Sequence, residues 1–318
     1  MKLIISELTA WKHYVTREFY YVMTELMGKY GWNQLDPSGI WNDSRPLDEM
    51  LLQRFGQMPD VILFWEGYEF LHAYQHFMKR LDCYKIILAD DLHWWDEQMR
   101  QNKCESFAMC DAILTTYKHV FGELYPGLAK HKRVVWVPHS ASPDFLLPFN
   151  EEPENAVLLS GAINKFYPLR QRMKALSKQR SYPIILHPHP GYHCGYDYEN
   201  NDHVGRAFAR LINQYRVAFT DSVKYRYLVA KYFEIPATGA LLLADDAVSE
   251  SYRQLGFTEY VHYVPASSEN IEERIAFVLD KSNRPQIDEM RRRGQELVLK
   301  QHTTSDRASL INEACKIR

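Results

Sequence analysis

The chain has 318 residues, of which 46% are hydrophobic and 25% charged, a globular composition with room for two domains of about 150 residues each. Its formal net charge of −2 gives no positive field with which to hold nucleic acid, so we expect no nucleic-acid partner. Its five cysteines form no Cys-x-x-Cys pair, and no apolar run reaches the roughly 18 residues of a transmembrane helix. We therefore expect a cytoplasmic protein with reduced thiols and no transmembrane segment.

In the first half, short apolar runs alternate with helix-like segments, as in α/β folds with a parallel sheet. The expected strands are Leu3–Ile5, Val61–Trp65, Tyr84–Leu88, Ala112–Thr115 and Val134–Val137. The expected helices are Arg17–Tyr30, Leu47–Phe55, Tyr68–Arg80, Trp94–Asn102 and Val120–Tyr125. Residues 1–145 are thus expected to form one Rossmann-like domain.

The Pro-rich, acidic stretch Pro143–Glu154 is typical of a linker, and the alternation restarts after it. The expected strands are Ala156–Leu159, Ile184–Leu186, Val217–Thr220, Ala240–Ala244 and Tyr260–Tyr263. The expected helices are Leu169–Lys178, Asn201–Gln214, Lys224–Phe233, Asp246–Leu255, Ile271–Asp280 and Gln286–Gln301. Residues 155–300 are expected to form a second Rossmann-like domain, and the tail, 301–318, could cross back to the first. Ligands of such sheets bind beyond the carboxyl ends of the strands.

An acidic residue stands before an apolar strand in the segment from Lys231 to Asp246. We expect a helix to end near Glu234 and Gly239 to permit a tight turn. A carboxylate at this edge of the sheet can accept two hydrogen bonds from vicinal hydroxyls, such as those of a ribose. The alternative for Glu234 is an ordinary glutamate on a helix surface.

A strand followed by glycine and a basic helix start lies between Leu158 and Arg170. Gly161 lets the backbone approach a ligand closely, and Pro168 suits the first turn of a helix, whose free N–H groups attract phosphate. Lys165 and Arg170 add positive charge. This pattern predicts a phosphate-binding loop; the alternative is an ordinary loop flanked by surface bases.

Three histidines and a cysteine lie between Ile185 and Cys194, which makes a zinc site one interpretation. Prolines stiffen the same stretch into an extended exit from a strand. We favour the interpretation without metal, in which His189, Gly191 and Tyr192 line a nucleotide or phosphate pocket.

The segment around Glu234 resembles the nucleotide-binding motif of GT-B glycosyltransferases, in particular the spore-maturation-protein (CgeB-like) group and glycosyltransferase family 4. The similarity covers about residues 155–310 well and the first half only loosely. It implies that Glu234 and Gly239 bind a nucleotide sugar. The positions that fit the motif are Phe233, Glu234, Ala237, Gly239 and Asp245.

One position departs from the family pattern. Many family 4 enzymes have another Glu eight residues earlier, which contacts the donor sugar, but here that position is Arg226. We expect Arg226 to face the donor diphosphate instead.

In the first half, Asp91 and His93 follow the strand Tyr84–Leu88. An Asp–His pair can tune a proton acceptor toward neutral pH, so these two are the predicted catalytic residues. The alternative is an aspartate, Asp90 or Asp91, that caps the next helix.

Three more residues at strand ends are predicted to contact the acceptor or line the cleft: Trp65, Glu66 and His139. An indole ring stacks well on the C–H face of a sugar, although core packing explains Trp65 nearly as well. A purely structural hinge is the alternative for His139.

The resemblance implies two Rossmann-like domains that face each other across a cleft, with residues 1–145 on the acceptor side and 155–300 binding the donor. It implies transfer of a hexose or pentose from a UDP- or GDP-sugar to a hydroxyl of a glycan, glycoprotein or small molecule. The reaction would be retaining and need neither metal nor other cofactor, because Lys165 and Arg170 would neutralise the diphosphate.

Two alternatives stay open: a sugar-nucleotide epimerase of the same fold, and a non-catalytic nucleotide-sugar-binding subunit. A dinucleotide oxidoreductase is disfavoured, since no Gly-x-Gly-x-x-Gly follows a predicted strand.

Overall fold

A computed structural model describes residues 1–40, 45–179, 181–193 and 195–316. The chain forms two compact units. The first unit comprises Met1–Trp11, Val22–Pro138 and Arg307–Arg318, and the second comprises Lys12–Tyr21 and His139–Asp306. None of the helices in these described ranges is long and apolar enough to cross a membrane.

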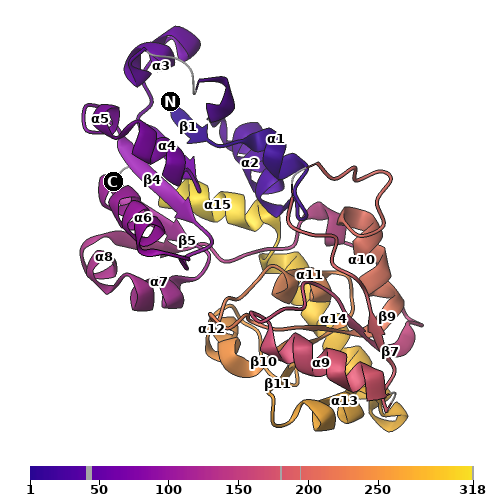
Figure 1. Cartoon of the computed structure of the whole chain (residues 1–318). Coiled ribbons are helices and arrows are strands. Elements are labelled where there is room, and N and C mark those ends of the chain that lie inside the picture. The colour runs from indigo at the N-terminus through magenta and orange to yellow at the C-terminus, as the bar shows by residue number, and fades with distance from the viewer. Residues whose placement is uncertain (41–44, 180, 194, 317–318) are drawn as a thin grey trace. The chain divides into compact units, whose positions relative to one another are not determined.

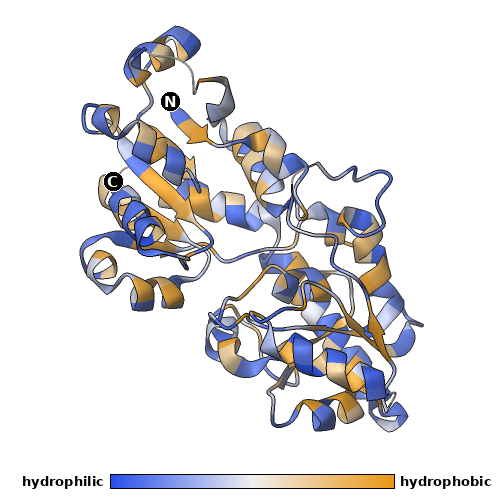
Figure 2. Cartoon of the chain, viewed as in Figure 1, coloured by the Kyte–Doolittle hydropathy of each residue, from blue (hydrophilic) through white to orange (hydrophobic). Residues whose placement is uncertain are grey.

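The first unit contains a six-stranded parallel sheet in the order β2-β1-β3-β4-β5-β6. Its inner strands are mostly apolar because both faces of such a sheet are covered, and Figure 2 shows them mostly in the hydrophobic colour. The strands are β1 (Lys2–Ile5), β2 (Asn33–Leu35), β3 (Val61–Trp65), β4 (Tyr84–Ala89), β5 (Ala112–Thr115) and β6 (Arg133–Trp136).

Short helices connect these strands, and α2 starts in the second unit and continues into the first. They are α1 (Leu8–Lys12), α2 (Glu18–Tyr30), α3 (Leu47–Phe55), α4 (Tyr68–Ala73), α5 (Gln75–Met78), α6 (Glu97–Met109), α7 (Lys118–Leu124) and α8 (Pro126–His131), with a 3-10 turn at Pro37–Gly39.

The last helix, α15 (Thr304–Ala314), joins the first unit from Arg307 onward. Its Asn312 accepts hydrogen bonds at Oδ1 from Lys2 Nζ at 2.8 Å and Trp32 Nε1 at 3.1 Å. Figure 1 shows this helix, in yellow, beside the purple strands of the first sheet. The last helix is therefore tied to the first strand and to the residue that precedes β2.

The second unit contains a five-stranded parallel sheet in the order β11-β10-β9-β7-β8. Together the two parallel sheets confirm the predicted α/β class. The strands are β7 (Glu154–Leu159), β8 (Ile184–Leu186), β9 (Tyr215–Thr220), β10 (Leu241–Asp245) and β11 (Tyr263–Ala266). The helices are α9 (Pro168–Gln179), α10 (Gly205–Gln214), α11 (Lys231–Ala237), α12 (Ser249–Gln254), α13 (Ile271–Leu279) and α14 (Arg284–Gln301), with 3-10 turns at Pro143–Phe145, Asp246–Val248 and Lys281–Asn283.

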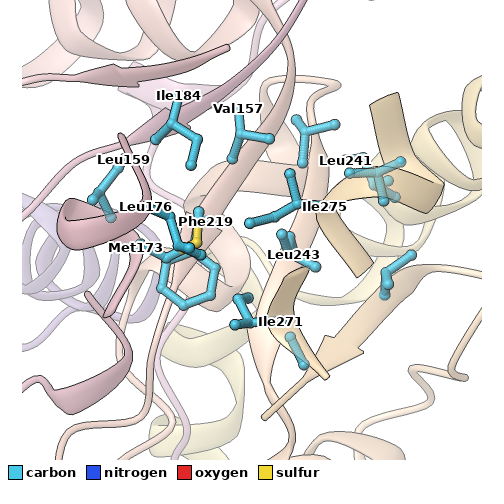
Figure 3. Packing of buried hydrophobic residues seen from close by; sticks show 14 of the residues in the cluster. Val157, Leu159, Met173, Leu176, Ile184, Phe219, Leu241, Leu243, Ile271 and Ile275 are labelled. Carbon is cyan, nitrogen blue, oxygen red and sulfur yellow. The ribbon is translucent and has the colours of Figure 1, made fainter. Parts of the chain in front are cut away.

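A hydrophobic core covers one face of the second sheet (Figure 3). Met173 and Leu176 from α9 and Ile271 and Ile275 from α13 pack on this face. Side chains two positions apart on a strand share a face, so every second residue of each strand belongs to this core. The strand residues of this face are Val157 and Leu159, Val217 and Phe219, Leu241 and Leu243, and Val264 and Ala266.

Several predicted elements need correction, among them α11, α6 and β11. Helix α11 begins at Lys231 rather than residue 224, because Val223 and Arg226 adopt left-handed φ angles of 61° and 59° that a helix excludes. Helix α6 begins after Asp96, whose Oδ1 accepts from Met99 N at 2.8 Å, so neither Asp90 nor Asp91 caps it. Strand β11 lies at Tyr263–Ala266, three residues beyond the predicted start.

Candidate functional site

The loops after β7 and β8 line an open pocket at the carboxyl edge of the second sheet. Its volume is about 410 Å³, within the roughly 300–1,000 Å³ of small-molecule sites. The lining residues are Gly161, Ala162, Ile163, Asn164, His187, Pro188, His189, Gly191 and Tyr192. Three of the predicted nucleotide-sugar residues, His189, Gly191 and Tyr192, are brought together here with a fourth, Gly161.

Gly161 is required where the pocket loop meets two cationic side chains. Its φ is 98°, a conformation that other residues avoid. A Cβ atom at this position would lie 2.6 Å from Arg170 Nη1 and 3.3 Å from Lys231 Cε. Glycine therefore lets both cations pack directly against the pocket backbone.

Arg170 is buried at 2% exposure and held from three sides. Its Nε lies 3.0 Å from Asp221 Oδ1, Nη2 donates to Thr220 Oγ1 at 2.9 Å, and Nη1 donates to the carbonyl of Ala162 at 3.1 Å. Part of its charge is thus balanced by Asp221. Arg170 fixes the loop that carries Gly161, and its predicted contact with phosphate would use the N–H groups that remain.

Lys165 is exposed, with Nζ 5.4 Å from the centroid of the Phe166 ring. Arg226 is also exposed, on the turn that follows β9. Neither side chain lines the pocket. Both residues therefore lie outside the lining of this pocket.

Glu234 lies inside α11 and is buried at 4% exposure, which rules out a surface glutamate. Burial raises the pKa of its carboxyl group, while the nearby charge of Lys231 lowers it. Thr16 Oγ1 donates to Glu234 Oε1 at 3.3 Å. A carboxylate kept in a buried, polar setting suits the binding of ligand hydroxyls.

Lys231 is the important residue that the sequence analysis missed. Its side chain is 17% exposed, and its Nζ lies 3.8 Å from Glu234 Oε2 and 4.4 Å from the centroid of the Phe208 ring. Burial lowers its pKa, and the charge of Glu234 raises it. A lysine three residues before Glu234 occupies the same helical face, and this spacing was the available signal.

His189 is held neutral by its surroundings. Burial and the charges of Lys231 and Arg170 lower its pKa to about 4. Its Nδ1 accepts from the backbone N–H of Gly191 at 3.0 Å, so the proton of the neutral ring is on Nε2. The ring packs against Tyr192 in a tilted arrangement, with centroids 4.4 Å apart. His189 can therefore donate one hydrogen bond to an anionic ligand near neutral pH.

The zinc interpretation finds no support in the ranges that the structure describes. No group of three or more His, Cys, Asp or Glu side chains there could hold a metal ion. Cys194, one of its candidate ligands, lies outside the described residues.

Gly239 allows close packing of neighbouring side chains and does not line the pocket. Its φ is 83°, and a Cβ atom there would lie 3.1 Å from the Phe149 ring and 3.3 Å from Gln295 Nε2. Its carbonyl accepts from Arg291 Nε at 2.9 Å. The glycine of the motif thus lets α14 approach the start of β10.

In the first unit, Glu66 and Asp90 meet at the carboxyl ends of β3 and β4. Asp90 N donates to Glu66 Oε1 at 2.9 Å. Burial, followed by the charges of Asp90 and Asp91, raises the pKa of Glu66 to about 8. The backbone of Glu66 has a φ of 49°, a strained conformation that is found most often at functional sites.

The predicted catalytic pair lies next to this carboxyl group. His93 Nδ1 is 4.0 Å from Asp91 Oδ1, a loose pair. Lys103 Nζ donates to the backbone carbonyls of Asp91 and His93 and anchors the loop. The exposed ring beside them is Trp95, at 61% exposure.

Two residues of the predicted acceptor group are buried. Trp65 is 3% exposed at the end of β3, which corrects the expectation of an open ring face. His139 belongs to the second unit, where its Nδ1 lies 2.7 Å from Glu18 Oε2 and its ring stacks on Phe19. Of this group only Glu66 retains partial exposure.

Comparison with known proteins identifies the fold. Residues 170–313 match the family described as "Glycosyl transferase-like". Sucrose-phosphate synthase from Thermosynechococcus elongatus superposes with a TM-score of 0.71 at 11% identity, over 98% of this chain and 97% of that one. The chain has the GT-B glycosyltransferase fold.

Two further GT-B structures match over 99% of both chains. One is an alpha-glucosyltransferase in complex with UDP-glucose and DNA, with a TM-score of 0.64 at 10% identity. The other is HepE from Anabaena in complex with UDP and glucose, with a TM-score of 0.60 at 9% identity. No curated protein matches the sequence. At these identities the likeness establishes the GT-B fold alone.

The expectation of a GT-B fold is confirmed, and the family match includes Arg170, Arg226, Glu234 and Gly239. The narrower resemblance to the CgeB-like group and to family 4 stays a prediction.

Proposed function

We propose that the second unit of this GT-B protein binds a nucleotide-diphosphate sugar and that the chain transfers the sugar to an acceptor hydroxyl. One observation carries the proposal: Lys231 and Glu234 lie 3.8 Å apart on one helix, and Lys231 packs beside Gly161, which lines the pocket. An acid and a cation that close together suit a ligand with both hydroxyls and phosphates.

In this proposal Glu234 accepts hydrogen bonds from the two ribose hydroxyls. A carboxylate offers about four lone-pair positions, and Thr16 uses one of them, so enough remain for a vicinal diol. Lys231 and His189 Nε2 face the diphosphate, with Arg170 behind them.

These groups supply the electrostatic stabilisation that bond breaking requires. The bond from the sugar C1 to the diphosphate breaks, a bond from C1 to the acceptor oxygen forms, and the acceptor proton is released. Negative charge grows on the departing diphosphate, where a desolvated lysine acts most strongly. Lys231 replaces Lys165 in the metal-independent scheme, and retention of configuration is proposed on the resemblance to family 4.

UDP-glucose is the first donor to test. Of the GT-B structures above, the alpha-glucosyltransferase is in complex with UDP-glucose, and HepE is in complex with UDP and glucose. The acceptor is proposed to meet Glu66, Asp91 and His93 at the strand ends of the first unit.

The test is a thermal-shift panel of UDP-, GDP-, ADP- and TDP-sugars in the presence of EDTA. A ligand that binds only the folded state raises the melting temperature by mass action. We expect one sugar nucleotide to raise it, and Glu234→Gln to abolish that shift. Glu289→Gln, on the exposed side of α14, is the matched control and should keep it. No shift with any of the nucleotides would refute the proposal.

Activity separates transfer from the alternatives. Release of the nucleoside diphosphate only when acceptor is added supports the transferase. Isomerised sugar nucleotide without acceptor would mean an epimerase, and tight binding without turnover would mean a non-catalytic subunit.

A further inference from the structure

A segment near the N-terminus is folded into the second unit. Residues Lys12–Tyr21 group with it, although the chain on both sides belongs to the first unit. The His13 carbonyl accepts from Gly195 N at 2.9 Å and Tyr196 N at 3.0 Å. These two residues belong to the same loop that lines the pocket with His189 and Tyr192. The segment is therefore attached directly to the pocket loop.

Arg17 anchors the segment on one side. Its Nε and Nη2 donate to the two oxygens of Asp144 at 3.0 and 2.6 Å, a bidentate pair. The guanidinium also lies 3.9 Å from the centroid of the Tyr198 ring. Tyr198 hydroxyl in turn donates to the Tyr14 carbonyl.

The next residue, Glu18, is a second anchor of the segment. Its Oε1 accepts from both the backbone N and the Oγ of Ser140, at 2.6 and 2.8 Å, and its Oε2 faces His139. The two residues that follow Thr16 are thus both held by hydrogen bonds between a charged side chain and the second unit.

The Thr16 hydroxyl lies against the carboxylate that the proposed ribose site uses. It donates to Glu234 Oε1 at 3.3 Å, while Lys231 Nζ is 3.8 Å from Oε2. Each oxygen of Glu234 therefore has one of these two groups beside it. Other charges that face Glu234 are Glu18 and His139, the first opposing and the second favouring its ionised form.

We propose that Thr16 is a positioning residue for Glu234: its hydroxyl orients the carboxylate, so that the N-terminal segment is a working part of the nucleotide site. This inference rests on the proposed function. Thr16 touches no reacting atom and acts only through Glu234.

The test compares Thr16→Val, which keeps the side-chain shape, with Thr16→Ser, which keeps the hydroxyl. Dissociation constants are measured for the nucleoside diphosphate that the panel selects and for its 2′,3′-dideoxy form, between pH 5 and pH 8. We expect Thr16→Val to weaken binding of the ribonucleotide about 10-fold, the usual effect of losing a hydrogen bond to a charged group. Binding of the dideoxy form should change less than about twofold.

The pH profile gives a second readout that a merely structural role would not move. Loss of the Thr16 hydrogen bond raises the pKa of Glu234, so the acid limb of ribonucleotide binding should move to higher pH in Thr16→Val. Thr16→Ser should restore both affinity and profile. If Thr16→Val melts much earlier than wild type, the comparison of Thr16→Ser with Thr16→Ala decides in the same way.

Equal loss for both nucleotides with an unchanged pH profile would overturn the positioning role. If Glu234→Gln abolishes the preference for the ribonucleotide but Thr16→Val leaves it intact, this inference alone fails. If the wild-type protein binds no nucleoside diphosphate, the proposed function fails and the inference with it.

Discussion

Replacing Lys231 by methionine would leave Glu234 buried without its cation. The two charges lie 3.8 Å apart, and at an effective dielectric constant of about 20 their attraction is about 4 kcal/mol. Desolvation of both groups offsets part of this, yet removing one partner of a buried pair typically costs about 3–5 kcal/mol. We therefore expect Lys231→Met to destabilise the folded protein by about 3 kcal/mol near pH 8.

The stability lost in Lys231→Met should depend on pH. Without Lys231, the folded-state pKa of Glu234 rises further above its unfolded value, because burial then acts unopposed. The stability of the variant is then greatest below the unfolded pKa of about 4.3 and is lost as pH rises through the folded pKa. The deficit of Lys231→Met relative to wild type should accordingly be large at pH 8 and small at pH 5.

Calorimetric unfolding of Lys231→Met, Glu234→Gln and the double variant measures this coupling. A loss of 1 kcal/mol lowers the melting temperature of a unit of this size by about 2–4 °C, so the single lysine variant should melt about 6–12 °C earlier at pH 8. The double variant should recover much of that loss, because no uncompensated charge remains. Lys178→Met, exposed on α9, should melt like wild type. A deficit that is equal at both pH values, or no recovery in the double variant, would refute the reasoning.

Two further substitutions test other parts of the account. Gly161→Ala would place a Cβ atom 2.6 Å from Arg170 Nη1 at a φ of 98°. We expect this variant to lose about 2–3 kcal/mol of stability and to lose nucleotide binding, as measured by melting and titration. The control Gly127→Ala, with open space around it, should be neutral in the same assays. For Glu66, whose pKa is raised to about 8, the wild type should lose stability relative to Glu66→Gln as pH rises from about 4.3 to 8. Equal pH dependence of unfolding in the two proteins would contradict the raised pKa.

The strands and the candidate loops could be predicted where the signal is local. The bounds of β3, β5 and α3 agree with the prediction because each is a clear apolar or amphipathic run between turn residues. The pocket residues at the ends of β7 and β8 followed from the rule that parallel strands bind ligands at their carboxyl edge.

The missed features depend on contacts between distant parts of the chain. Val223 and Arg226 form a turn with left-handed φ angles, so α11 begins only at Lys231. The sequence pattern did not reveal this turn, and Glu234 was therefore predicted at a helix end rather than inside a helix. Asp221, which engages Arg170, is fifty-one residues away from it in sequence. Thr16 reaches Glu234 across 218 positions, and no local pattern signals such a contact.

A crystal structure of the protein soaked with its nucleoside diphosphate in the presence of EDTA tests the central claim most directly. The account predicts both ribose hydroxyls within about 2.5–3.2 Å of the Glu234 carboxylate, with the phosphates facing Lys231 Nζ and His189 Nε2. A nucleotide bound elsewhere, or one that reaches neither Glu234 nor Lys231, would contradict it.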